Sequence, residues 1–221
     1  MRIQDNPFAS EEITPPFSDE WAAKRRVADA IRQLTEVLVT SSPDIEKMHA
    51  IAAQLEVTAV DFRTSPRIFG RSEWAATDEH GSFGQVSHEL NPVAGWSNPI
   101  APPLNSWIDE DLALGTCQCG WVYEGPPGSV HGGVVAYIFD QFLGMAQAHG
   151  GQPGMNGYLH VNYHNRTPLN TELTLEGRLI KVEGRKATMH GEMYADGIMT
   201  ASAEGLFVQP KGGIYSIKAQ K

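Results

Sequence analysis

The spacing of hydrophobic positions changes along the chain from helical to strand-like. Between residues 19 and 55, apolar side chains recur every three or four positions, which predicts two amphipathic helices. The first runs from Asp19 to about Thr40 and the second to about Leu55. Between them, Ser41-Ser42-Pro43-Asp44 supplies a helix cap and a proline suited to a first helical turn. We interpret both helices as packing elements, and a regulatory or partner-binding role is the alternative.

Residues 61–110 follow no regular periodicity, so we predict a long irregular segment. Prolines exclude regular helix from its second half (Pro92, Pro99, Pro102 and Pro103). A loop of this length is uncommon in a compact domain and is often functional. Its aromatic side chains indicate that it packs against the rest of the protein. Structural wrapping is the first interpretation, and coverage of a substrate cleft is the alternative.

A long apolar segment begins at His131-Gly132-Gly133 and ends near Gly150-Gly151. Between His131 and His149, Asp140 is the only charged side chain. A helix that is apolar nearly all round belongs inside a core, where a lone carboxylate is costly unless it is paired or used. We therefore predict a buried central helix with Asp140 as its working group.

Segments after this helix alternate apolar and polar side chains as strands do. They span residues 157–164, 171–182, 185–195 and 198–209. Glu183-Gly184 and Asp196-Gly197 are hairpin turn signals between the later segments. With a further strand over 114–123, these elements predict an antiparallel sheet curled around the central helix, which is an α+β fold.

The chain length of 221 residues fits one domain with a substantial extension. We place the N-terminal extension at residues 1–110, beginning with an irregular arm over 1–18 and continuing through the two helices and the irregular segment. The sheet-and-helix domain is expected at 111–212, followed by a tail at 213–221.

Charge and cysteine content exclude several classes of function. A formal net charge of −9 argues against nucleic acid as the main partner, although a local basic cluster would still suit an anionic ligand. No apolar run approaches the ~20 residues of a membrane span, and the start lacks the order of a signal peptide, so a cytoplasmic protein is the default. The two cysteines, Cys117 and Cys119, share one face of a strand and are expected to be buried free thiols. No metal site or cofactor is predicted.

The glycine-rich helix start and the carboxylate suggest acyl chemistry. Gly132 and Gly133 open the positive end of the helix, where unpaired N–H groups would suit an oxyanion hole. Asp140 is then a candidate general base or nucleophile. The structural alternative is an ordinary glycine-rich start and a hydrogen-bonding aspartate. Tyr137, Gln141 and Gly144 are expected around the pocket floor, with Gly144 leaving room beside the carboxylate.

The two groups cannot serve one carbonyl from a single helix. Nine residues separate His131 from Asp140, which is roughly 13 Å along the axis and about half a turn around it. We therefore expect the start of one subunit's helix near the middle of its partner's, in a two-fold homodimer with two equivalent sites, or in a dimer of dimers.

The motif and the strands around it resemble the hotdog-fold acyl-CoA thioesterases, especially the phenylacetate-pathway (PaaI-like) and thioesterase-superfamily group. The likeness rests on His131-Gly132-Gly133, then Asp140 and Gly144, with the hairpins that follow, and covers roughly residues 112–210. It implies a hotdog fold and a thioester carbonyl polarised by the Gly132 N–H, helped by Gly133. Asp140 of the opposite subunit matches the catalytic carboxylate.

The resemblance assigns further roles to individual residues. His131 matches the motif histidine, which orients the turn or contacts the thioester; a simple capping role is the alternative. Asn156 stands where this group often carries Thr or Ser to assist the carboxylate, and it cannot be a nucleophile. Arg185 and Lys186 stand where CoA phosphates are often bound, although two solvated charges are the alternative.

The leading hypothesis is hydrolysis of an acyl-CoA thioester to acid and CoA. A non-catalytic acyl-CoA or lipid-binding protein using the same pocket is the second, and a scaffold whose N-terminal helices bind a partner is the third. Hydratase or dehydratase motifs are not found, which leaves dehydration a weak alternative.

Overall fold

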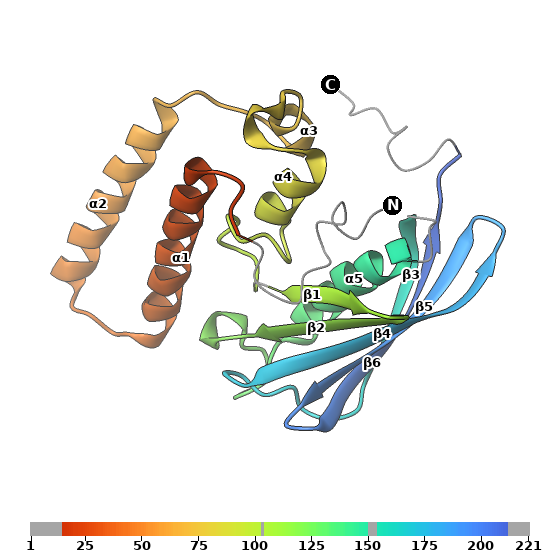
Figure 1. The fold of residues 1–221 in the computed structure, drawn as a ribbon. Coiled ribbons are helices and arrows are strands. Elements are labelled where there is room, and N and C mark those ends of the chain that lie inside the picture. The colour runs from red at the N-terminus through yellow and green to blue at the C-terminus, as the bar shows by residue number, and fades with distance from the viewer. Residues whose placement is uncertain (1–14, 103, 150–153, 212–221) are drawn as a thin grey trace.

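The structure is a computed structural model that describes residues 15–102, 104–149 and 154–211 (Figure 1). The predicted tail at 213–221 and most of the predicted arm at 1–18 lie outside these residues. An antiparallel sheet wraps one long helix, α5 (Gly132–His149), and an N-terminal helical extension precedes it. This is the predicted α+β hotdog arrangement.

The sheet has the strand order β1-β2-β4-β5-β6-β3, and every neighbouring pair is antiparallel. Its strands are β1 (Asn105–Asp109), β2 (Leu112–Gln118), β3 (Met155–Tyr163), β4 (Glu172–Glu183), β5 (Lys186–Ala195) and β6 (Ile198–Val208). The predicted hairpin turns occur, with positive φ at Gly184, Asp196 and Gly197. Because β1 and β3 occupy the two ends of the order, they are the edges of the sheet.

The hydrophobic core lies between α5 and the concave face of the sheet. It includes Ile138, Phe139, Phe142 and Leu143 from the helix and Leu173, Leu175, Met189 and Met193 from the strands. Glycines in the sheet allow close packing: a Cβ at Gly177 would lie 2.8 Å from Phe142, and one at Gly191 would lie 2.8 Å from Leu143. Both predicted free thiols, Cys117 and Cys119, are buried in this core.

The segment predicted to be irregular contains regular structure, which corrects the prediction for residues 61–110. It holds α3 (Arg71–Trp74), a 3-10 turn η2 (Asp78–His80), α4 (Phe83–Leu90) and the edge strand β1. Ser82 and Gln85 form a capping box at the start of α4. Strand β1 pairs with β2 from Asn105 onward, so the sheet begins before the boundary predicted at residue 111.

The extension starts with two long helices, α1 (Asp19–Thr40) and α2 (Ile45–Arg63). The predicted bounds of α1 are confirmed, whereas α2 extends eight residues beyond the predicted end at Leu55. Figure 1 shows α1 and α2 standing outside the layers formed by the sheet and α5. Helix α2 has no buried residue. The prediction that both helices act as packing elements therefore holds for α1, which buries Trp21 and Ala28. It does not hold for α2 within a single chain.

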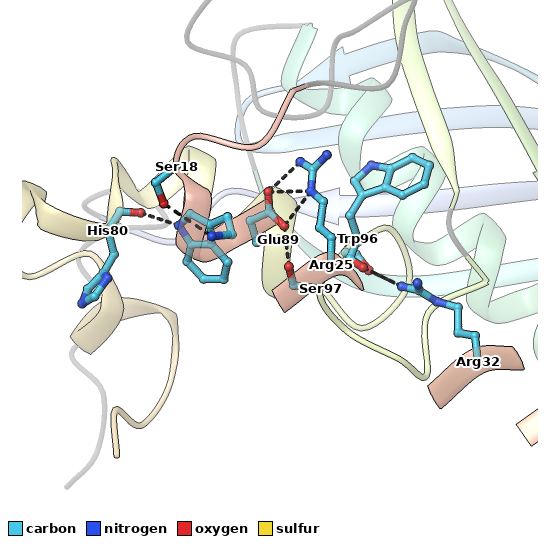
Figure 2. A network of polar contacts seen from close by, with 9 residues as sticks. Ser18, Arg25, Arg32, His80, Glu89, Trp96 and Ser97 are labelled. Carbon is cyan, nitrogen blue, oxygen red and sulfur yellow. Dashed lines mark hydrogen bonds and ion pairs between the residues drawn. The ribbon is translucent and has the colours of Figure 1, made fainter. Parts of the chain in front are cut away.

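Charged side chains fasten α1 to the rest of the extension (Figure 2). Arg25 donates to both carboxylate oxygens of Glu89, which is 2% exposed, and Ser97 donates to Glu89 at 2.6 Å. Arg32 donates to the carbonyl oxygens of Trp96 and Asn98 at 2.7 and 2.9 Å. A buried carboxylate is stable only with such partners, so these contacts fix the face that α1 turns toward the body.

No helix among the described residues is long and apolar enough to cross a membrane.

Candidate active site

The start of α5 is held by a backbone hydrogen bond to the short 3-10 turn η3 (Trp121–Tyr123). The His131 N–H donates to the Tyr123 carbonyl at 2.9 Å, and the N–H groups of Val134 and Val135 donate to the His131 carbonyl. Tyr163 of β3 donates its hydroxyl to the Gly132 carbonyl at 2.8 Å. The peptide groups around Gly132 are thus held from two sides.

The His131 side chain caps the helix. The Gly133 N–H donates to His131 Nδ1 at 2.9 Å, which requires an unprotonated Nδ1. Of the first amides of α5, Gly132 therefore has the N–H that meets no acceptor within the described residues. Of the two predicted oxyanion-hole donors, Gly132 is the one whose N–H is open to a ligand.

Asp140 is exposed, which corrects the prediction of a carboxylate buried in a core. The sheet covers one side of α5, and the side that carries Asp140 is left open in a single chain. Asn156 of β3 donates to Asp140 Oδ1 at 2.5 Å. Asn156 and Asp140 are therefore brought together as predicted, and Oδ2 has no hydrogen-bond partner within the described part of the chain.

Gly132 and Asp140 lie eight residues apart on the same helix, which separates them by roughly 12 Å. Both are accessible in a single chain, and each is next to β3, through Tyr163 and Asn156 respectively. Strand β3 is an edge strand with most of its residues exposed, including Met155 at 53% and Tyr163 at 55%. The two halves of the predicted site thus border one open, partly apolar edge.

The predicted pocket-floor residues contact the N-terminal extension. Tyr137 donates its hydroxyl to the Pro92 carbonyl at 2.8 Å, and Gln141 accepts a hydrogen bond from Asn91 at 2.9 Å. Burial of its side chain raises the pKa of Tyr137. Residues 91–92 therefore contact this face of α5, and coverage of a substrate cleft by the segment stays a prediction. At Gly144 an added Cβ would make one ordinary van der Waals contact, 3.7 Å from Phe207.

Arg185 and Lys186 lie at the β4–β5 hairpin. Lys186 pairs with Val208 on β6, and Val208 pairs with Met155 on β3. Lys186 is therefore two strands away from the residue that precedes Asn156. Its side chain lines a shallow cavity on the convex face with Lys181, Tyr158 and Glu204, whereas its neighbour Ala187 is buried. Arg185 donates to the Gln209 carbonyl at 2.7 Å. Both cations are thus near the end of the sheet that holds Asn156, and Lys186 lies on the opposite face from α5.

Sequence reasoning missed Glu36 and Tyr163. The Glu36 carboxylate accepts hydrogen bonds from the N–H groups of Trp121 and Val122 at 2.9 and 3.3 Å, and thereby caps η3. No local pattern links residues that are 85 positions apart. For Tyr163, the alternation of apolar and polar residues indicates a strand but not that the hydroxyl reaches the Gly132 carbonyl.

Comparisons with known proteins indicate the family of this chain. A family model described as the thioesterase superfamily matches residues 127–202. Acyl-coenzyme A thioesterase THEM4 of Xenopus laevis is 31% identical over 94 residues, covering 42% of each chain. The Bos taurus protein of the same name is 29% identical over 103 residues, covering 46% of this chain and 42% of its own. The chain thus spans less than half the length of these relatives.

A crystal structure of a thioesterase superfamily protein is similar over a much larger region. It is 35% identical, with a TM-score of 0.73, and the match covers 88% of this chain and 97% of that one. A match of this extent includes most of the helical extension as well as the sheet and α5. The chain belongs to the thioesterase superfamily.

Proposed function

We propose that this protein hydrolyses acyl-CoA thioesters to a free acid and CoA. The observation that carries the proposal is a pair of groups on α5, namely the Gly132 N–H, which meets no acceptor among the described residues, and the exposed Asp140 carboxylate held by Asn156. Membership in the thioesterase superfamily and the names of the THEM4 relatives support the same activity.

In the proposed reaction, the thioester carbonyl oxygen accepts the Gly132 N–H at the positive end of α5. Negative charge that develops on this oxygen is stabilised there. Asp140 acts as general base or nucleophile. As a base, it takes a proton from water while the water oxygen bonds to the carbonyl carbon. The C–S bond then breaks, and the proton passes to the departing CoA thiolate.

As a nucleophile, an Asp140 carboxylate oxygen would instead bond to the carbonyl carbon while the C–S bond breaks and CoA leaves as the thiolate, which takes a proton from water; water then hydrolyses the mixed anhydride to the free acid and Asp140. Mass spectrometry of acid-quenched protein distinguishes the two roles, because only a nucleophilic Asp140 acquires the mass of the acyl group.

The proposed site is shared between two copies of the chain. Because Gly132 and Asp140 are roughly 12 Å apart along one helix, a single carbonyl reaches both only when they come from different subunits. We propose that the subunits meet along β3, since this edge strand carries both Asn156 and Tyr163 and exposes apolar side chains. Arg185 and Lys186 are the proposed contacts for the CoA phosphates.

The second candidate is an acyl-CoA or lipid-binding protein without catalysis. Asn156 favours this candidate. Its amide donates to Asp140 Oδ1, at a position where the thioesterases that this chain resembles often carry Ser or Thr. CoA release from short, medium, long and aromatic acyl-CoAs tests both candidates. We expect Asp140→Asn to abolish release, with Asp109→Asn, an exposed aspartate of β1, as the matched control.

Release that is absent from the wild type, while acyl-CoA still binds, would establish the binding protein instead. Equal release by the wild type and Asp140→Asn would mean that the catalytic residue is another one.

A further inference from the structure

Helix α1 exposes an apolar stripe, although it also buries Trp21 and Ala28. Its face toward the body carries charged side chains, Arg25, Arg32 and Glu36, each held by the hydrogen bonds described above. The members of the exposed stripe are 36–65% exposed: Val27, Ile31, Leu34 and Leu38. Since the charged contacts determine the orientation, α1 cannot rotate to bury these side chains within one chain.

Helix α2 carries a second apolar stripe with the same spacing. Its positions are three and four residues apart, and they are occupied by Ile45, Met48, Ala52, Leu55, Ala59 and Phe62. The large members are 43–68% exposed, even though α1 is the nearest long helix in Figure 1. Apolar positions with this alternating spacing are typical of helices that pack against other helices along their length.

The two stripes together expose an apolar area comparable with one side of a stable interface. The eight large side chains (Val27, Ile31, Leu34, Leu38, Ile45, Met48, Leu55 and Phe62) expose on the order of 800 Å², against about 800 Å² per partner in a standard interface. Neither stripe contains a charged position, so the surface that covers it must be apolar as well.

We propose that the α1–α2 pair is a self-association surface that binds the α1–α2 pair of a second copy of this chain, forming a four-helix arrangement. A two-fold contact brings the same surface of both subunits together, and an apolar stripe can pack on the matching stripe of a second copy. The area also matches what such a contact needs. This interface is distinct from the proposed β3 contact and does not depend on the proposed activity.

The test uses the full chain and two paired variants. Leu34→Glu with Leu55→Glu places one carboxylate on each stripe, whereas Gln33→Glu with Gln54→Glu adds the same charges to exposed positions beside the stripes. Molecular mass is measured by sedimentation and light scattering over a wide range of concentrations. Circular dichroism checks the fold, which we expect to be unchanged because the substituted side chains are exposed in a single chain.

We expect the stripe variant to need at least about tenfold more protein to reach the wild-type mass, since association would bury unpaired carboxylates, and the control to match the wild type. A stripe variant with the same mass profile as its control would overturn the proposal. So would a wild-type chain that does not associate through this surface and instead sediments with phosphatidylcholine vesicles. CoA release by the stripe variant is measured as well, so that a loss of association can be distinguished from a loss of the proposed activity.

Discussion

The Asn156 amide nitrogen lies 2.5 Å from Asp140 Oδ1 and connects the edge strand β3 to the middle of α5. The contact fixes one carboxylate oxygen and leaves the other open to solvent or to a ligand. It also makes β3 part of the candidate site, together with Tyr163 at the start of the same helix. Each of these contacts leads to a prediction.

Loss of the Asn156 amide should weaken catalysis more than binding. In Asn156→Ala, Asp140 is no longer held in one orientation, and we expect kcat to fall by roughly tenfold with little change in KM. Asn162→Ala, on the same strand, is the matched control. Steady-state CoA release measures both, and an unchanged kcat for Asn156→Ala would exclude this positioning role.

The Tyr163 hydroxyl should matter for the oxyanion hole. Tyr163→Phe removes the hydrogen bond to the Gly132 carbonyl and releases the peptide next to the proposed donor, so we expect kcat to fall by roughly tenfold. Tyr158→Phe removes a hydroxyl from the same strand, where it contacts Glu204, and should retain wild-type kcat. Similar kinetics for the two variants would contradict the prediction.

Glu36 should position the start of α5 from outside the sheet. Glu36→Ala removes the acceptor for two N–H groups of η3, whose Tyr123 carbonyl holds His131. We expect a lower kcat with unchanged KM, and partial recovery in Glu36→Gln, which retains an acceptor oxygen. Gly120→Ala should resemble Glu36→Ala, because its Cβ would lie 2.6 Å from the carboxylate. Glu46→Ala on α2 is the control.

Asn91 should stabilise the fold through its contact with α5. Its side chain accepts hydrogen bonds from the Val93 and Ala94 N–H groups and donates to Gln141, and Asn91 is 5% exposed. Asn91→Ala leaves buried donors unpaired, which should lower the free energy of unfolding by about 2–4 kcal/mol. Urea unfolding measures this change. A loss below about 0.5 kcal/mol, the usual range for a surface substitution, would argue against the contact.

Cys117 should become a source of instability at alkaline pH. The pKa of the Cys117 thiol is raised well above its usual 9.0. The larger cause is a hydrogen bond with Cys119, and the second is burial. The folded state therefore keeps this proton at a pH where the unfolded chain releases it, so stability is full below pH 9.0 and declines as the pH rises above it. Cys117→Ala should flatten that decline in urea unfolding measured from pH 8 to 10. An identical decline in both proteins would assign it to other groups.

Much of the hotdog body was predictable because its signals are local. The 3.6-residue period gave α1 its bounds, the glycine pair and apolar run gave α5, and Glu183-Gly184 and Asp196-Gly197 gave the hairpins. Asp140 and Gly132 were singled out by type and spacing, and Asn156 by the family resemblance; the structure brings Asn156 to Asp140. Strand β1 was missed because five residues carry too short a pattern, and its pairing with β2 stabilises it.

The sequence by itself determined where α1, α5 and the two hairpins lie, because periodicity and turn chemistry act between near neighbours. Only the tertiary structure decided what each face meets. It left Asp140 exposed, since the sheet covers α5 on one side, and it used His131 to occupy the Gly133 N–H. It also turned the apolar stripe of α1 outward, because Arg25 and Arg32 find their partners in a segment more than 60 residues away. Such contacts depend on distances between remote segments, which no local pattern encodes.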